Sequence, residues 1–375
     1  MPPERVRAFA PGRVNLIGEH TDYNGGLALP LAISQGIVVA AQASAESGIR
    51  ARAVDLDEED AFALNDRTRV DGWRAFVRGT VAELSDAGTA LPGASVQIGG
   101  DLPRGAGLSS SAALEVSLSL ALLALAGERV EPVEGDRELD DHAPGDAPGD
   151  PRAGGGAPTA RARRMEIARL CARVENEWVG AQTGLLDQLA SLFGRRDTAL
   201  RIDFHTLDIQ PVPLRLGDWR LVVLDSGQRH THSGGDYNER RAECARACQL
   251  LGISSLSLAG AQAVERLGEP LRRRARHVLS ENERVLAAVD ALRDGDMPAL
   301  GRLLDASHAS LRDDFEISTP AVEAAVVRLR DAGAAGARIM GGGFGGCVLG
   351  LFAPRAQPPA DAIDVRPGPG AHLLE

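Results

Sequence analysis

The sequence contains no lysine, so all 41 of its Lys and Arg positions are arginine. P-loop proteins place a lysine after a glycine-rich turn, and protein kinases place a strand lysine on the nucleotide phosphates. Both of these large classes of ATP-binding protein are therefore excluded. Any nucleotide site in this chain must hold phosphate through backbone amides, hydroxyl groups or arginine.

Cysteine and long apolar runs are also scarce. Four cysteines scattered over 375 residues do not read as a disulfide framework, so we expect reduced thiols. No apolar run reaches the roughly 20 residues that a membrane span needs, and no signal-peptide pattern opens the chain. We therefore expect a cytoplasmic protein with no membrane partner. A net charge of −11 argues against a nucleic-acid partner, because phosphate backbones are held by clustered basic residues.

The chain length indicates two domains, because single hydrophobic cores stop growing at roughly 250 to 300 residues. The apolar pattern is mixed α/β, and we place the domain boundary near residue 214, giving domains 1–214 and 215–375. Strands are expected at residues 6–9, 14–17, 36–42, 95–99, 219–225 and 347–352, and helices at 111–125, 162–178, 236–251 and 320–332.

Residues 131–160 hold 5 prolines, 6 glycines and 8 acidic residues, with almost nothing to bury. Such a composition is typical of a disordered segment. Because it separates two helical stretches, we expect an insertion that loops out of the N-terminal domain and has no catalytic role.

One glycine-rich stretch, DLPRGAGLSSSAALEVSL at residues 101–118, precedes a run that predicts a buried helix. Gly105 and Gly107 let the backbone curl so that N–H groups point inward, and a helix start adds free donors and partial positive charge. The hydroxyls of Ser109, Ser110 and Ser111 can then bind phosphate or Mg²⁺. The alternative is a serine-capped helix after a flexible loop, since serine is a favoured N-cap.

A second glycine-rich stretch, GGGFGG at residues 341–346, matches the dinucleotide fingerprint in spacing but not in context. That fingerprint needs a helix after its glycines, whereas residues 347–352 predict a strand. We therefore reject an oxidoreductase. A tight turn remains, which either packs against a neighbour or forms a wall of the active site.

Charged residues crowd the two ends of a short apolar run in APGRVNLIGEHTDYNGG, residues 10–26. The charges of a surface strand would alternate with apolar residues, so this pattern indicates a site. Asp187 lies among apolar residues in GLLDQLASLFG, where a carboxylate needs a partner or a purpose. Taken alone, the position of Asp187 is more typical of a helix cap or a salt-bridge partner. The position of Glu175 is typical of the solvent-exposed edge of a helix.

Together these segments resemble the galactokinase family of the GHMP kinase superfamily. GRVNLIGEHTDYNGG resembles the family signature, GAGLSSSA the superfamily's ATP-binding motif, and GARIMGGGFGGC its C-terminal motif. The resemblance covers nearly the whole chain outside residues 131–160. It implies an α/β (α+β) fold of two domains, one like ribosomal protein S5 and a C-terminal one that is ferredoxin-like, with the active site in the cleft between them.

The resemblance also implies a reaction and the residues that perform it. Family members phosphorylate the C1 hydroxyl of α-D-galactose with ATP and Mg²⁺, the first step of galactose catabolism in the Leloir pathway, and we expect a monomer. Asp187 would accept the hydroxyl proton, and Arg13 would keep that carboxylate ionised. Sugar binding is implied for Glu19, His20, Thr21, Asp22, Gly184 and Tyr237, ATP binding for Gly105, Ala106, Gly107, Leu108, Ser109, Ser110 and Ser111, and metal binding for Ser111 and Glu175.

Two alternatives stay open. A related sugar 1-kinase acting on N-acetylgalactosamine or L-arabinose would need only a modest change in the sugar site. Asn176 and the segment DSGQRHTH at residues 225–232 depart from the usual family pattern, which bears on sugar selectivity. A non-catalytic sensor that binds sugar and ATP to control transcription would have lost part of the serine loop, which this chain retains.

Overall fold

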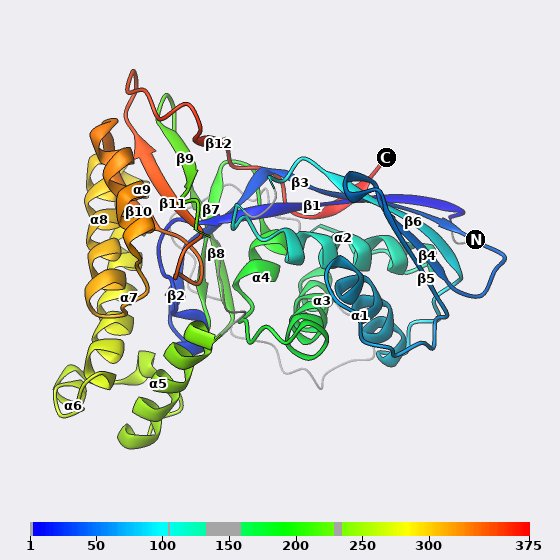
Figure 1. Cartoon of the computed structure of the whole chain (residues 1–375), viewed down its shortest axis with the longest axis horizontal. Helices are drawn as coiled ribbons and strands as arrows, with labels where there is room; N and C mark the ends of the chain where they lie inside the picture. The colour runs from blue at the N-terminus through cyan, green and yellow to red at the C-terminus, as the bar shows by residue number, and fades with distance from the viewer. Residues whose placement is uncertain (1–2, 104–105, 133–158, 229–234) are drawn as a thin grey trace.

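The N-terminal part of the molecule is built on a six-stranded sheet. A computed structural model describes residues 3–103, 106–132, 159–228 and 235–375. The sheet has the order β13-β1-β3-β6-β4-β5 and is antiparallel except between β4 and β6. Its strands are β1 (Arg5–Asn15), β3 (Pro30–Ala43), β4 (Ile49–Ala53), β5 (Glu58–Phe62), β6 (Ala94–Gly100) and β13 (His372–Leu374). Helices α1 (Trp73–Asp86), α2 (Ser110–Leu125), α3 (Ala160–Arg173) and α4 (Leu186–Phe193) lie on one side of it (Figure 1).

Strand β1 carries an irregularity that shapes the site. The sequence predicted separate strands at residues 6–9 and 14–17, whereas the structure has one strand whose pairing with β3 shifts register between Pro11 and Arg13. At this shift the Arg13 N–H donates to the Leu108 carbonyl at 3.1 Å. A Cβ on Gly12 would lie 2.5 Å from the same carbonyl oxygen, so only glycine allows this close approach. We call residues 105–111 the glycine-serine loop. The bulge thus holds Leu108 of this loop against β1.

Helix α2 is the centre of the N-terminal core. Its residues from Ala112 to Leu125 are all buried, as expected for a helix that is apolar on nearly every side. It packs on β1 and β3 and is covered by α1, α3 and α4. The helix predicted from residue 111 is therefore confirmed, with its start one residue earlier.

The helical run predicted at residues 162–178 is confirmed, but the helix changes type within it. α3 is followed by a π-helical turn, η3 (Val174–Val179), which ends at Gly180 in the left-handed conformation. A π turn carries an extra residue and therefore rotates the side chains that follow around the helix axis. Glu175 is buried as a result, with 4% of its surface exposed, and is not a solvated edge residue.

The C-terminal part is a four-stranded antiparallel sheet, β10-β11-β9-β12, covered by helices. Its strands are β9 (Arg220–Asp225), β10 (Ala334–Ile339), β11 (Cys347–Phe352) and β12 (Ile363–Val365), and its helices are α5 (Gly235–Leu251), α6 (Ala261–Val264), α7 (Leu271–Asp294), α8 (Met297–Asp313) and α9 (Pro320–Asp331). The predicted elements at residues 219–225, 236–251, 320–332 and 347–352 are confirmed. The long helices α7 and α8 stand together at the end of the molecule opposite α1 (Figure 1).

A three-stranded sheet and short turns complete the described chain. The small sheet consists of β2 (Leu27–Ala28), β7 (Thr198–Asp203) and β8 (Asp208–Pro213), and the 3-10 turns are η1 (Asp22–Asn24), η2 (Val54–Leu56) and η4 (Leu256–Leu258). The boundary near residue 214 falls between β8 and β9 and stays a prediction. The last strand, β13, pairs with β1, so the chain crosses back to the N-terminal sheet.

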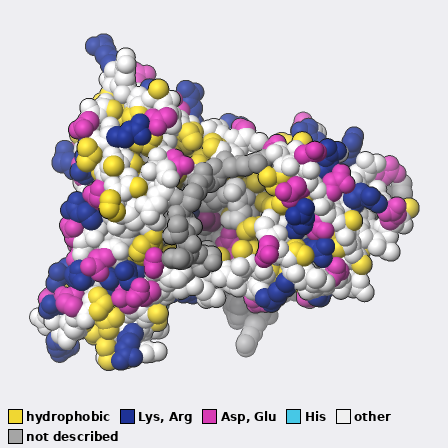
Figure 2. Space-filling view, in the orientation of Figure 1, with side chains coloured by type: hydrophobic (Ala, Val, Ile, Leu, Met, Phe, Trp, Pro, Cys, Tyr) yellow, Lys and Arg dark blue, Asp and Glu magenta, His cyan; other side chains and the backbone are white. Residues whose placement is uncertain are grey.

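Charged side chains of both signs lie on the surface of the molecule (Figure 2). Arginine and acidic side chains are interspersed over the face shown in Figure 2. Within the described ranges, no helix has the length and apolarity that crossing a membrane requires.

The predicted insertion at residues 131–160 is described only at its ends. Thr159 caps α3 by accepting a hydrogen bond from the Ala162 N–H at 3.2 Å, and the Glu131 carbonyl accepts one from Arg164 at 2.8 Å. Residues 133–158 lie outside the described part of the chain. Both ends therefore contribute contacts to the N-terminal core.

We predict that replacing residues 133–158 by a short Gly-Ser linker leaves turnover largely intact, because the contacts of Thr159 and Glu131 are kept. Steady-state kinetics of the purified variant measures this. Deleting the whole of residues 131–160 is the matched comparison, and it should lower the thermal unfolding midpoint because the helix cap is lost. Loss of turnover in a folded 133–158 deletion would contradict the prediction.

Candidate active site

An ion pair between Arg13 and Asp187 lies where the glycine-serine loop meets the start of α4. Arg13 Nε donates to Asp187 Oδ1 at 2.7 Å, and Arg13 Nη1 donates to the Gly107 carbonyl at 2.8 Å. The Ser109 hydroxyl donates to Asp187 Oδ2. The arginine side chain is 9% exposed and the aspartate side chain 26% exposed. A carboxylate held by charge-assisted bonds on one side is thus open to a ligand on the other.

A cavity of about 440 Å³ opens beside this ion pair. Arg13 and Asp187 line this cavity. So do five of the predicted sugar-binding residues, Glu19, His20, Asp22, Gly184 and Tyr237. The backbone of residues 341–343 forms a further wall. The structure therefore brings together residues from the loop after β1, from the start of α4, from α5 and from the turn after β10. We call this space the sugar cavity.

Thr21 is not brought to the sugar cavity. It is fully buried, and its hydroxyl lies 2.7 Å from the Leu27 carbonyl and 2.9 Å from the Gly18 carbonyl. Threonine at this position therefore closes the loop that follows β1, and it does not face a ligand. The sequence motif contains both kinds of residue, and the spacing alone does not separate them.

Glu19 is fixed by groups from the C-terminal part. Its Oε1 accepts a hydrogen bond from the Gly341 N–H at 2.9 Å and lies 3.2 Å from Nη2 of Arg338. Arg338 is fully buried on β10, and its Nη1 donates to the carbonyls of Asn15 and Leu16 at 2.9 and 2.8 Å. One arginine thus joins the end of β1 to the carboxylate that faces the sugar cavity.

His20 occupies the left-handed region, with φ of 60°, and is packed among aromatic rings. Its ring centroid lies 4.7 Å from that of Phe315 and 5.3 Å from that of Tyr237, and its Nδ1 is 2.7 Å from the Tyr23 hydroxyl. Burial, with a smaller contribution from His277, lowers the pKa of His20 to about 3. The ring is therefore a neutral hydrogen-bonding group at physiological pH.

Asp22 and Gly184 approach each other so closely that a side chain on the glycine is excluded. A Cβ on Gly184 would lie 1.9 Å from Asp22 Oδ2. Burial, supported by the charges of Asp187 and Glu19, raises the pKa of Asp22 to about 6. Four acidic residues, Glu19, Asp22, Asp187 and Asp236, line this one cavity and indicate a ligand rich in hydroxyl donors.

Helix α7 holds both ends of the loop that carries Glu19 and His20. Glu281 accepts a hydrogen bond from the Gly18 N–H at 2.9 Å, and Asn282 accepts one from the Leu27 N–H at 2.8 Å. Nε2 of His277 lies 3.1 Å from the Glu19 carbonyl. The sequence did not predict roles for these α7 residues. His277 and Glu281, polar residues at spacing i and i+4 on one face of a long helix, carry a signal that points to two of them.

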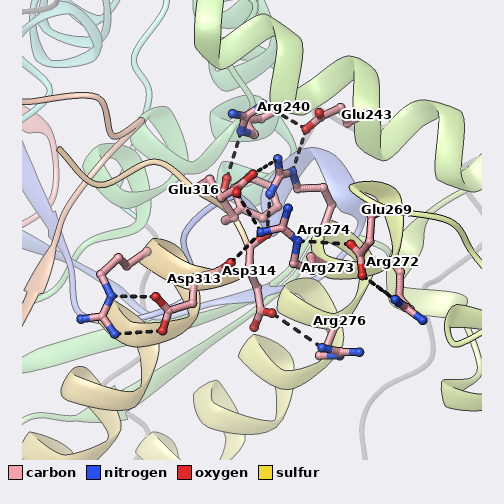
Figure 3. Close-up of polar contacts among 12 residues, drawn as sticks. Arg240, Glu243, Glu269, Arg272, Arg273, Arg274, Arg276, Asp313, Asp314 and Glu316 are labelled. Atoms are coloured by element: carbon pink, nitrogen blue, oxygen red, sulfur yellow. Dashed lines mark hydrogen bonds and ion pairs between the residues drawn. The ribbon is translucent and has the colours of Figure 1, made fainter.

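An arginine-rich cluster supports Phe315 behind His20. Figure 3 shows Arg273 and Arg274 from α7 converging on Glu316. Arg274 also binds Glu243 at 2.7 Å and the Asp314 carbonyl at 2.5 Å. These bonds fix the segment around Phe315, whose ring contacts both His20 and His277.

The glycine-serine loop lines a second cavity of about 360 Å³, which we call the phosphate cavity. Ala106, Gly107, Leu108, Ser109, Ser110 and Ser111 line it, and Gly105 lies outside the described residues. Gly107 and Ser109 have φ of 63° and 58°, and Ser109 does not cap α2. The serine-capped alternative is therefore wrong, and no side chain of the described residues caps the first N–H groups of α2, which lack partners within the helix and can bind an anion.

Ser111 and Glu175 meet at the edge of this loop. The Ser111 hydroxyl donates to Glu175 Oε1 at 2.9 Å, and the Thr183 hydroxyl donates to Oε2. Burial, followed by the charge of Asp187, raises the pKa of Glu175. Carboxylate and hydroxyl oxygens are ligands that Mg²⁺ accepts, and a cation here would offset the burial of the carboxylate. The donor set therefore fits the predicted metal site.

A third cavity, of about 400 Å³, shares Ser110 and Ser111 with the phosphate cavity. It is mainly apolar, and Trp73, Phe76 and Leu114 are among its walls. The sequence did not predict this cavity. Trp73 and Phe76, at spacing i and i+3 in α1, pack against the N-terminal core and also line the cavity, and their spacing in the sequence indicates only the core packing.

The turn at residues 341–346 joins β10 to β11. All of its residues except Gly342 have positive φ, and a Cβ on Gly343 would lie 2.5 Å from Ile317. A strand follows, as predicted, so the turn does not open a dinucleotide-binding helix. Its backbone lines both the sugar cavity and the phosphate cavity.

Comparison with known proteins agrees with this geometry. Family models match as the galactokinase galactose-binding signature at residues 2–43, the GHMP kinase N-terminal domain at 75–137 and the GHMP kinase C-terminal domain at 288–366. A galactokinase from Mycobacterium tuberculosis is 42% identical over 94% of this chain and 91% of its own length, and one from a Roseiflexus species is 41% identical over 91% and 82%.

Solved structures give the same result for the fold. The crystal structure of Lactococcus lactis galactokinase complexed with galactose matches with a TM-score of 0.84 and 30% identity, covering 100% of this chain and 96% of that one. The Methanococcus jannaschii mevalonate kinase matches at a TM-score of 0.66 and 16% identity, covering 96% and 97%, and so shares the fold. The two-domain GHMP kinase fold expected from the sequence is confirmed, and the chain belongs to the galactokinase family of sugar-phosphorylating enzymes.

Proposed function

We propose that this chain transfers the γ-phosphoryl group of ATP to the C1 hydroxyl of α-D-galactose, giving α-D-galactose 1-phosphate and ADP. The observation that carries the proposal is the Arg13–Asp187 pair, which lines both the sugar cavity and the phosphate cavity. A general base must lie within hydrogen-bond reach of the proton it removes, and among the described residues the partner of Asp187 Oδ2 is the rotatable hydroxyl of Ser109.

The remaining roles follow from which groups face each cavity. Asp187 accepts the proton of the C1 hydroxyl, and Arg13 stabilises both that carboxylate and the phosphoryl group in transfer. Glu19, His20, Asp22 and Tyr237 bind the other sugar hydroxyls. The inward N–H groups of residues 106–111 bind the triphosphate. The apolar cavity beside Trp73 holds the adenine ring of ATP.

Ser111 and Glu175 would hold Mg²⁺ in this proposal, and the bound ion would neutralise triphosphate charge. The cavities are lined by residues of a single chain, which supports a complete site in a monomer. Cys171, Cys244 and Cys248 form no disulfide, as expected for a cytoplasmic enzyme.

We predict that Asp187→Ala lowers turnover by about three or more orders of magnitude, because it removes the proton acceptor. Folding and ATP binding should persist, since the triphosphate is held by backbone amides. The measurements are single-turnover kinetics, thermal unfolding and ATP titration. A variant that keeps a near-normal rate would exclude Asp187 as the base, and a wild-type chain that binds ATP and sugar without turnover would favour the sensor.

A sugar panel tests the substrate. We expect ATP-dependent 1-phosphate formation with kcat/KM highest for galactose, and weaker turnover of N-acetylgalactosamine and L-arabinose. The departures at Asn176 and at residues 225–228 make this comparison informative, since Gln228 lines the sugar cavity. Phosphorylation of another sugar but not of galactose would establish the alternative kinase.

We predict that the KM for galactose falls as the pH rises through about 6, because Asp22 then ionises and accepts stronger hydrogen bonds. Ionisation of Asp22 has the opposite effect on folding: it strengthens sugar binding but lowers the stability of the folded chain. The folded-state pKa of Asp22 lies above its ordinary value of 3.8, so the contribution of this residue is largest below that value and is lost as the pH rises to about 6. Asp22→Asn should raise the KM and remove the pH dependence, and a pH dependence unchanged in this variant would assign it to another group.

A further inference from the structure

The sugar cavity and the phosphate cavity share a small set of walls. These are Arg13, Asp187, Gln228, Gly341 and Gly342. Because the acceptor occupies one cavity and the donor phosphates the other, the phosphoryl group must pass the residues common to both. Among these five residues, Gln228 has the only side chain without a role in the proposed phosphoryl transfer.

Arg13 uses Nε on Asp187 and one Nη1 hydrogen on the Gly107 carbonyl, which leaves its Nη2 group for the phosphoryl group. The Gly341 N–H is bound to Glu19. A second, uncharged donor at the junction can come from Gly342 or from the carboxamide of Gln228.

The carboxamide of Gln228 is held with its acceptor occupied. The Thr319 hydroxyl donates to Gln228 Oε1 at 2.8 Å, and no described residue accepts a hydrogen bond from Nε2. The Gln228 carbonyl accepts a bond from the Gly346 N–H at 3.0 Å, and a Cβ on Gly345 would lie 2.6 Å from that oxygen. Backbone and side chain are both fixed, which leaves the two Nε2 hydrogens as donors for a ligand.

We propose that Gln228 is a further catalytic residue, whose Nε2 donates a hydrogen bond to the phosphoryl group during transfer, with Thr319 as its positioning residue. This rests on the proposed function. In the step, the sugar hydroxyl gives its proton to Asp187, its oxygen forms the new bond to phosphorus, and ADP leaves with the electron pair of the broken bond.

A neutral, fixed donor suits this position. Charge in the transition state is spread over the equatorial oxygens of the phosphoryl group, and a donor already aimed at those oxygens needs no reorganisation. Its contribution is realised in the transition state more than in the ground state, so its loss should appear in kcat and not in KM.

The test compares Gln228→Met, Gln228→Glu and the wild type under single-turnover conditions with galactose and MgATP. We expect Gln228→Met to slow the chemical step about 100-fold, the usual effect of removing one such donor, with each KM changed less than about 3-fold. Gln228→Glu should lose more, because it sets a negative charge against the phosphoryl group. Thr319→Val should show a partial loss that Thr319→Ser restores, and this pair decides the question if the Gln228 variants fail to fold.

The matched control is Gln210→Met, at an exposed glutamine of β8 whose Nε2 binds Asp208 at 2.8 Å, and its rate should equal that of the wild type. A Gln228→Met rate within about 2-fold of wild type, or a change confined to KM, would overturn the inference. A wild type that does not phosphorylate galactose would instead overturn the proposed function, so the two failures are distinguishable.

Discussion

The ion pair of Arg13 and Asp187 is the constraint on which the rest of the site depends. Asp187 is one of several acidic side chains gathered around two adjoining cavities, and the bond from Arg13 sets a positive charge beside its carboxylate. Arg13 can supply that contact only because the bulge in β1 and the absence of a side chain at Gly12 bring the glycine-serine loop against the strand. The same guanidinium holds the Gly107 carbonyl. The positions of Asp187, the proposed base, and of the glycine-serine loop are therefore set by one side chain.

The loop at residues 18–27, which carries Glu19 and His20, depends on contacts with the C-terminal part of the molecule. It leaves β1 in the N-terminal sheet, yet its Gly18 N–H, its Glu19 carbonyl and its Leu27 N–H are all bound by α7. The Glu19 carboxylate is bound by β10 and by the turn after it. A shift of the C-terminal helices would consequently move Glu19 and His20 relative to Asp187. The fold thus fixes the positions of Glu19 and His20 relative to Asp187, because it ties a loop of the N-terminal part to helix α7 of the C-terminal part.

Local pattern and the family resemblance together predicted much of this arrangement. The runs at residues 111–125 and 347–352 are recognisable because their apolar residues are continuous, and the glycine-serine loop because glycines before a helix start form a backbone site for phosphate. The roles of Arg13 and Asp187 are implied by the resemblance, since local pattern alone indicates only that Asp187 needs a partner or a purpose. Two kinds of feature could not be predicted. The π turn at Val174 leaves no trace in an apolar stripe, so the burial of Glu175 was missed. Residues such as Arg338 and Asn282 act through partners more than 200 positions away, and no periodicity encodes such pairings.

The absence of lysine has a structural counterpart in the buried arginines. Arg338 serves two carbonyls and a carboxylate, and Arg164 serves the carbonyls of Glu131, Leu192 and Ala371. An ammonium group is a strongly hydrated point charge with three donors, whereas a guanidinium presents five donors in a plane and is more weakly hydrated. A planar donor set can bridge segments that end at different heights, such as the end of β1 and the Glu19 loop. Arginine therefore joins several backbone ends at once in this chain, and at Arg338 it also supplies positive charge beside the Glu19 carboxylate.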